Sequence, residues 1–169
     1  MIRPATPADL DAITVVHAEA RATYYRGHLP DEEFDGPAER ARTRAAWATG
    51  LSRDEPGAAV LCAEHDGRPV GVAAYRRVDG VMTLTQLHVA PAHWRRGIGA
   101  ALHEACVAAW RRDGVGTARL EVFEPNKRAQ AFYAAHGWYP DPDTPRDGTH
   151  LILRLAVGRT AKPAPLPQE

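Results

Sequence analysis

The segment VMTLTQLHVAPAHWRRGIGAALH, residues 81–103, changes character twice along its length. Residues 81–89 are mostly β-branched or aliphatic and roughly alternate in polarity, which predicts a strand with one buried face. Pro91 ends this strand, and after Gly97 and Gly99 apolar and small residues recur at the spacing of an α-helix. The segment therefore predicts a strand, a loop and a helix, with the two glycines at the N-terminus of the helix.

The predicted helix start is suited to an anion, because its first N–H groups have no partner within the helix and carry partial positive charge. Glycines have no Cβ, so a group as large as a pyrophosphate can approach these N–H groups. Arg95 and Arg96 would add full positive charges. Two interpretations stay open: a phosphate-binding loop, or a glycine-containing helix start with surface arginines.

Length and composition narrow the class of protein. A chain of 169 residues predicts one domain, assigned to residues 1–157, and the proline-rich residues 158–169 predict a flexible C-terminal tail. Lys plus Arg and Asp plus Glu are equal at 21 each, which argues against a nucleic-acid partner. No apolar run is long enough for a signal peptide or a membrane span, and no Cys/His spacing typical of a metal site occurs. We therefore expect a cytoplasmic protein that binds neither membrane nor metal.

The remaining sequence predicts a mixed α/β sheet in the order β-α-α-β-β-β-α-β-α-β. Asp66-Gly67 supplies the positive φ values of a tight hairpin, and the crossover through the glycine-containing helix makes its two flanking strands parallel. The expected strands cover residues 2–5, 58–64, 69–76, 81–89, 118–123 and 149–156, with a short extra strand near Trp138-Tyr139. The expected helices run from Thr6-Pro7 to about Arg21 or slightly further, from Pro37 to Thr49 with Gly50 as the stop residue, from the glycines to Asp113-Gly114, and from Asn126 to Gly137.

Several of these pieces, in this order and at this spacing, resemble the GNAT superfamily of acyl-CoA-dependent N-acetyltransferases. The resemblance covers nearly the whole chain and rests on IRPATPAD (residues 2–9), Leu87-His88-Val89-Ala90-Pro91, RRGIGA (residues 95–100), NKRAQAFY (residues 126–133) and Gly137-Trp138. It implies a GNAT-type mixed, mostly antiparallel sheet that contains a splayed parallel strand pair and is flanked by helices. It also implies acetyl-CoA (coenzyme A) as the cofactor.

The resemblance implies how this cofactor is held. Its pyrophosphate would bind at the loop and helix start formed by Arg95, Arg96, Gly97, Ile98, Gly99 and Ala100. Backbone groups of Leu87, His88 and Val89 would pair with the pantetheine arm as an added strand does, and the N–H of Val89 would face the thioester carbonyl. The family usually has Gln or Arg three residues before the first glycine, where this chain has Trp94. This departure puts one polar contact in doubt.

Asn126 and Tyr133 are seven residues apart, so they share one face of the predicted helix and can both face the slot, with Phe132 beside them. In the resembled family a tyrosine of the Phe-Tyr pair donates a proton to the leaving thiolate, and it maps to Tyr133. From the helix alone, a pair of core aromatics is the simpler interpretation. The whole pattern favours Tyr133 as the donor.

The group that takes the proton of the amine is less clear from the sequence. Glu121 and His88 are candidate bases, acting directly or through water. The structural alternatives are an ion-paired strand residue for Glu121 and a hydrogen-bonded histidine at the rim for His88. Tyr24, Tyr25 and His28, in the turn from Tyr24 to Pro30, are candidates for the acceptor wall or for ordinary packing between helices.

The expected activity is transfer of acetyl from acetyl-CoA directly to a primary amine of a small molecule or peptide by a sequential mechanism. A homodimer is in keeping with the resemblance. One alternative is a non-catalytic acyl-CoA-binding regulatory protein. Another is an NAD-dependent oxidoreductase, with Glu121 or Glu124 on a ribose. Two features oppose the oxidoreductase: Leu102 stands at the third glycine position, and a six-residue loop separates the strand from the glycines.

Overall fold

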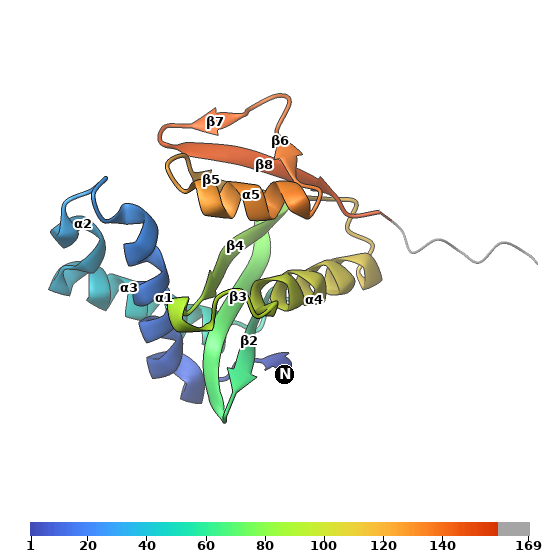
Figure 1. Cartoon of the computed structure of the whole chain (residues 1–169). Coiled ribbons are helices and arrows are strands. Elements are labelled where there is room, and N and C mark those ends of the chain that lie inside the picture. Colours follow the sequence, from blue (N-terminus) through green and yellow to red (C-terminus); the bar gives the residue numbers. More distant parts are fainter. Residues whose placement is uncertain (159–169) are drawn as a thin grey trace, which may run out of the picture.

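The computed structural model describes residues 1–158, so the predicted tail, residues 158–169, lies outside it apart from its first residue. The described residues form one mixed sheet of eight strands with helices on both faces (Figure 1). The strands are β1 (Ile2–Pro4), β2 (Ala59–His65), β3 (Arg68–Val78), β4 (Val81–Val89), β5 (Thr117–Phe123), β6 (Tyr139–Pro140), β7 (Arg146–Asp147) and β8 (His150–Ala156). The α-helices are α1 (Leu10–Tyr25), α2 (Asp31–Asp35), α3 (Pro37–Ser52), α4 (Ile98–Arg112) and α5 (Lys127–Ala135), and the short 3-10 helices are η1 (Pro7–Asp9) and η2 (Pro91–His93).

The strands lie in the order β1-β2-β3-β4-β5-β8-β6, and β7 pairs with β8. Each of these pairs is antiparallel except β4 with β5. The parallel pairing is short, with Met82 opposite Ala118 and Thr83 opposite Arg119. The two strands then separate, which confirms the predicted mostly antiparallel sheet with a splayed parallel pair. The sheet of a dinucleotide-binding oxidoreductase is mostly parallel, so this topology does not fit that alternative.

β4 carries a bulge beside the point where it leaves β5. Ala74 lies opposite Gln86 and Tyr75 opposite Leu84, so Thr85 is an extra residue in β4. The hydroxyl of Thr85 donates to the carbonyl of Ala74 at 3.1 Å. Because a bulge bends its strand and increases the local twist, it accounts for the separation of β4 from β5.

Helices cover both faces of the centre of the sheet, with α1 and α3 on one side and α4 on the other (Figure 1). Val72 and Ala74 of β3 pack in one apolar cluster with Ile13 of α1. Ala73 of β3, which points to the opposite face, packs in a second cluster with Leu102 of α4. In the neighbouring strand β4 the consecutive residues Met82, Thr83 and Leu84 are all buried, so both of its faces are covered there and the prediction of one buried face is wrong. The alternating side chains of β4 face two different buried environments, which polarity alone does not distinguish.

Predictions at the ends of two helices need correction, and one short helix was not predicted. α1 continues to Tyr25, so Tyr24 and Tyr25 lie in its last turn and not in the connection that follows. α3 continues through Gly50 to Ser52, so Gly50 is not the stop residue. The sequence did not indicate α2, because five residues with the single buried side chain Phe34 show no helical period.

The predicted turns and the extra strand are confirmed. Asp66 and Gly67 have φ values of 50° and 74° in the β2–β3 hairpin. Gly137, with a φ of 90°, follows the end of α5. The short extra strand is β6, which pairs with β8.

A charged cluster fixes the start of the fold. Asp9 accepts hydrogen bonds from Nη1 and Nη2 of Arg3 at 2.8 and 2.9 Å and from the N–H of Thr6 at 2.8 Å. The bond from Arg3 is the main cause that lowers the pKa of Asp9 from 3.8 to about 2. Because the pKa is lower in the folded state than in the unfolded chain, the stabilisation is present at neutral pH. It is lost as the pH falls from about 4 to about 2.

We expect Asp9→Asn to lower the free energy of unfolding by about 2 kcal/mol at pH 7. The difference from the parent protein should shrink as the pH falls below 4, because the parent carboxylate is then protonated. Urea unfolding of both proteins at pH 7 and near pH 3 measures this difference. An equal difference at both pH values would contradict the account.

No helix within residues 1–158 is long and apolar enough to cross a membrane. In the same part of the chain, no three His, Cys, Asp or Glu side chains are grouped so that they could hold a metal ion.

Candidate active site

A cavity of about 1010 Å³ opens where β4 and β5 separate. Residues of α1 and α3 form one wall, and residues of β4, β5 and α5 form the other. Five residues predicted to bind the cofactor or to act in catalysis line it: Leu87, His88, Glu121, Asn126 and Tyr133. The remaining predicted cofactor residues lie outside the cavity wall: Val89, Phe132 and residues 95–100.

The backbone of β4 offers unpaired groups to this opening. The N–H of Ala90 donates to the carbonyl of Val70 at 2.8 Å, so these two residues form a hydrogen-bonded antiparallel pair. Such pairs alternate along a ladder, and the register places Leu87 and Val89 at the positions between them. The N–H and C=O groups of Leu87 and Val89 therefore point away from β3. Of these four groups, the carbonyl of Val89 accepts the indole N–H of Trp94 at 2.9 Å. An extended ligand could pair with the other three as an added strand.

The N-terminus of α4 also presents free N–H groups. Gly97 precedes it with a φ of 75°, no side chain caps it, and its first helical bond joins the N–H of Ala101 to the carbonyl of Gly97 at 3.0 Å. The N–H groups of Ile98, Gly99 and Ala100 thus have no acceptor within the helix. A Cβ on Gly97 would meet no atom within 4 Å, so the space beside Gly97 is open.

Small residues let the helix start approach its neighbours. A Cβ built on Gly99 would lie 3.5 Å from the ring of Phe132 and 3.7 Å from Cγ2 of Val89. A Cβ on Gly71 of β3 would lie only 3.0 Å from side-chain carbons of Ile98 and Leu102. The structure therefore brings Val89, Phe132 and Gly99 together at the start of α4.

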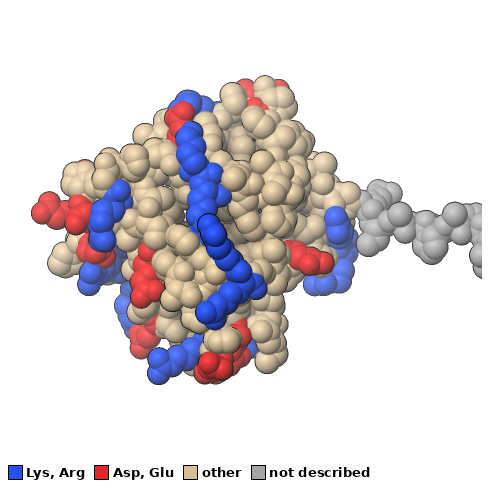
Figure 2. All heavy atoms as spheres, in the orientation of Figure 1, with Lys and Arg blue, Asp and Glu red and all other residues tan. Residues whose placement is uncertain are grey.

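Positive side chains surround this helix start. Figure 2 shows Lys and Arg side chains in a line across the face that carries the N-termini of α4 and α5. Arg95 and Arg96 are exposed in the loop before α4. The guanidinium carbon of Arg128 lies 3.3 Å from the ring centroid of Trp94, whose indole N–H donates to the carbonyl of Val89 at 2.9 Å. Trp94 therefore positions a cation here by stacking. Sequence reasoning did not identify Arg128.

Tyr133 lies in α5 with only 9% of its surface exposed, and burial raises the pKa of its phenol. Among residues 1–158 no group hydrogen-bonds its hydroxyl, yet the only fully enclosed polar side-chain atoms without a partner are Arg21 Nε and Trp110 Nε1. The hydroxyl of Tyr133 must therefore open into the cavity. Asn126 lines the same cavity and caps α5, because its Oδ1 accepts the N–H of Ala129 at 3.2 Å.

The two candidate bases lie in different surroundings. His88 is buried, its Nε2 lies 2.6 Å from Oε1 of Gln86, and its ring stacks on that of His17 with 4.3 Å between centroids. Burial is the main cause that holds the pKa of His88 well below 6.5, so the ring is neutral at pH 7. Glu121 is exposed, and its Oε1 lies 3.3 Å from Nη2 of Arg119.

Two of the three residues predicted to bind the acceptor line the cavity, and the third does not. Tyr24 and Tyr25 are half-buried and line the cavity from the last turn of α1. The Tyr25 ring lies 4.9 Å from that of Phe123, on the opposite wall. His28 is exposed and does not line the cavity, although its ring lies 6.0 Å from the same Phe123.

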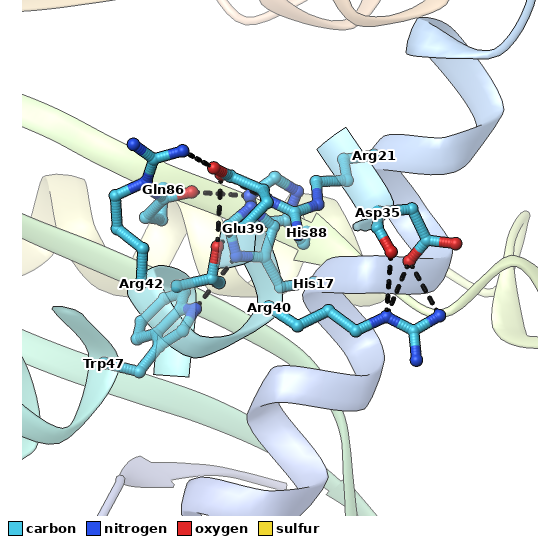
Figure 3. A network of polar contacts seen from close by, with 10 residues as sticks. His17, Arg21, Asp35, Glu39, Arg40, Arg42, Trp47, Gln86 and His88 are labelled. Carbon is cyan, nitrogen blue, oxygen red and sulfur yellow. Dashed lines mark hydrogen bonds and ion pairs between the residues drawn. The ribbon is translucent and has the colours of Figure 1, made fainter. Parts of the chain in front are cut away.

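The sequence did not indicate a polar network between α1 and α3 (Figure 3). Trp47 donates its indole N–H to Nδ1 of His17 at 2.9 Å, and burial lowers the pKa of His17 to about 4. Nη1 of Arg21 donates to Thr43 at 3.1 Å and to Glu39 at 3.3 Å. A signal was available, because His17 and Arg21 are one helical turn apart on the buried side of α1.

A mostly antiparallel sheet with one splayed parallel pair, beside an uncapped helix start that contains glycine, is the arrangement that the resemblance to the GNAT superfamily implies. The profile of the family described as Acetyltransferase (GNAT) family matches residues 18–138, which is more than half of the chain. The chain therefore belongs to the GNAT acetyltransferase family, whose members use acetyl-CoA.

Sequence relatives and solved structures agree with this membership. The chain is 38% identical over 85 residues to uncharacterized N-acetyltransferases of Mycobacterium bovis and Mycobacterium tuberculosis, a match over 50% of this chain and 54% of theirs. It thus spans about half the length of these curated relatives. The fold is similar to that of the PaiA N-acetyltransferase from Thermoplasma acidophilum in complex with coenzyme A, with a TM-score of 0.83 and 20% identity over 92% of this chain and 98% of that one. It is also similar to the ribosomal-protein-S18-alanine N-acetyltransferase from Escherichia coli, with a TM-score of 0.70 and 20% identity over 97% of each chain.

Proposed function

We propose that this protein transfers an acetyl group from acetyl-CoA directly to a primary amine of a small molecule or peptide, by a sequential mechanism. The observation that carries the proposal is the hydroxyl of Tyr133, which has no hydrogen-bond partner within residues 1–158. Tyr133 lines the same cavity as Leu87, whose backbone groups are not paired with β3. Membership of the GNAT family supports the donor. The coenzyme in the similar Thermoplasma acidophilum structure supports it as well.

The residues around α4 fit this cofactor. The N–H groups of residues 98–100 have no partner within the helix and no side-chain cap, and the space beside Gly97 is open, as a diphosphate requires. Arg95, Arg96 and Arg128 would neutralise its charge. Leu87 and Val89 offer backbone groups to the amides of the pantetheine arm. When bound, acetyl-CoA supplies an acetyl group activated as a thioester.

The chain's own groups then assist the transfer. The N–H of Val89 stabilises the negative charge that develops on the carbonyl oxygen. Tyr133 stays protonated at neutral pH because burial raises its pKa, so it can donate a proton to the departing sulfur. His88, neutral at pH 7, or Glu121 accepts the proton of the amine directly or through water.

Direct transfer also agrees with the state of the cysteines. Cys62 and Cys106 are both fully buried, and burial raises the pKa of each thiol, that of Cys106 to about 12. Neither is suited to act as a nucleophile, because the thiolate is the reactive form. A cytoplasmic location, a homodimer and the limits of a single domain stay predictions, and size-exclusion chromatography tests the homodimer.

The test is thiol release from acetyl-CoA with a panel of amines that includes amino acids, polyamines, amino sugars and short peptides. We expect one class of amine to release thiol and to gain the mass of one acetyl group per thiol released. Binding of coenzyme A without turnover on any amine would instead favour the non-catalytic regulatory protein.

A further inference from the structure

Arg21 is a buried cation inside the cavity wall. Its side chain is 6% exposed, and it lines the cavity from α1 together with His17 and Tyr24. Its interactions with neighbouring residues are few for a guanidinium, which has five N–H donors. Only Nη1 is used, at 3.1 Å to Thr43 and 3.3 Å to Glu39. Nε is fully enclosed without a partner.

Arg21 shares its carboxylate partner with a second arginine. Glu39 is the one carboxylate that pairs with it among residues 1–158, and Glu39 also pairs with Arg42 (Figure 3). Two guanidinium groups thus share one carboxylate. His17 and His88 add no charge at pH 7, because burial lowers the pKa of both. The side chain of Arg42 is 75% exposed, so solvent accommodates the extra positive charge, and what the buried guanidinium of Arg21 lacks is hydrogen-bond partners.

One nitrogen of Arg21 is available to a ligand. Nη2 makes no hydrogen bond within residues 1–158, and it is not among the enclosed atoms that lack a partner. It therefore opens into the cavity that Arg21 lines. The side chains of His88 and Tyr133, where the amine and the thioester would meet, line the same cavity. The charge of Arg21 also reaches His88, because it is one of the causes that lower the pKa of that ring.

We propose that Arg21 selects the acceptor by binding the carboxylate of a small primary amine, so that the substrate class is the amino acids. The inference rests on the proposed N-acetyltransferase activity. A carboxylate can accept charge-assisted hydrogen bonds from the two N–H groups of Nη2, which have no partner within residues 1–158. The amine of the same small molecule can then lie within a few bonds of this anchor, beside His88 and Tyr133.

The full chain is assayed with acetyl-CoA and matched pairs of acceptors, each amino acid being compared with its primary amide. The amide keeps the amine and the side chain and removes only the negative charge. For the preferred acceptor we expect the acid to have a kcat/KM at least tenfold higher than the amide, mainly through KM. In Arg21→Gln the kcat/KM for the acid should fall at least tenfold, to the value for the amide. The kcat/KM for the amide should change less than twofold.

Two variants separate substrate binding from structure. Arg21→Lys keeps the charge and should retain part of the preference for the acid. Arg40 lies in α3 like Glu39 but does not line the cavity, and it forms an exposed ion pair with Asp35. Arg40→Gln should therefore leave the preference for the acid over the amide unchanged. A structural role alone for Arg21 would lower kcat/KM for acid and amide equally.

The possible results distinguish this inference from the proposed function. Equal kcat/KM for acid and amide in the parent protein, or an unchanged preference in Arg21→Gln, would overturn the role of Arg21 and leave the acetyltransferase intact. If no amine is acetylated, the proposed function fails. Calorimetric titration with N-acetylated amino acids and their amides then decides the role of Arg21. Binding of acids alone, lost in Arg21→Gln, supports it, and equal or absent binding of both forms contradicts it.

Discussion

Tyr133→Phe should lower kcat about 100-fold and leave the affinity for coenzyme A within twofold of the parent protein. Loss of a positioned proton donor typically costs 10² to 10⁴ in rate. The ring of Tyr133 packs against Phe132 and Trp138, and phenylalanine keeps that packing. Only the hydroxyl that opens into the cavity is removed. Steady-state thiol release and calorimetric titration with coenzyme A measure the two effects separately.

The matched control is Tyr139→Phe, which removes an exposed hydroxyl on β6 that does not line the cavity. It should leave kcat unchanged. Because burial, followed by the nearby Cys106, raises the pKa of Tyr133 above 10, the phenol should remain a donor throughout the range from pH 7 to pH 10. Turnover in Tyr133→Phe equal to that of the parent protein would show that the donor is another group or water.

Gly97→Val should weaken the binding of coenzyme A at least tenfold. Gly97 has a φ of 75°, a region that a β-branched residue enters only with strain. The backbone is therefore expected to change just before Ile98. That change would turn the free N–H groups at the start of α4 away from a bound diphosphate. Calorimetric titration with coenzyme A measures the loss.

A second glycine controls for the strain itself. Gly67, in the β2–β3 hairpin, has a φ of 74°, and a Cβ there would also meet no atom within 4 Å. Gly67→Val should lower thermal stability by an amount similar to Gly97→Val and leave coenzyme affinity unchanged. Unaltered affinity for coenzyme A in Gly97→Val would show that the diphosphate does not bind at this helix start.

The sequence predicted the elements that are proposed to hold the cofactor because these elements are adjacent in the chain. Val81–Val89 was predicted with its observed bounds, since Gly80 and Pro91 stand on either side of it. The glycines and the strand before them are adjacent in the chain, so turn chemistry and period were enough to place them. The parallel pairing of β4 with β5 followed from the crossover through α4.

The polar network between α1 and α3, where the acceptor is proposed to bind, was not predictable in the same way, because its residues meet only through tertiary packing. Trp47 and His17 are separated by 30 residues, yet they share a hydrogen bond. From the sequence, Arg21 has the pattern of an ordinary arginine on the surface of a helix. Only the packing of α3 against α1 places Glu39 and Thr43 beside it. Tyr24 was assigned to a turn because its aromatic neighbours broke the apolar pattern that the helix in fact continues.

The measurement that tests the account most directly is a crystal structure of the protein with coenzyme A. We predict that the diphosphate accepts hydrogen bonds from the N–H groups of residues 98–100. We also predict that the thiol sulfur lies within hydrogen-bond reach of the Tyr133 hydroxyl. A diphosphate bound elsewhere, or a Tyr133 hydroxyl directed away from the sulfur, would contradict the account.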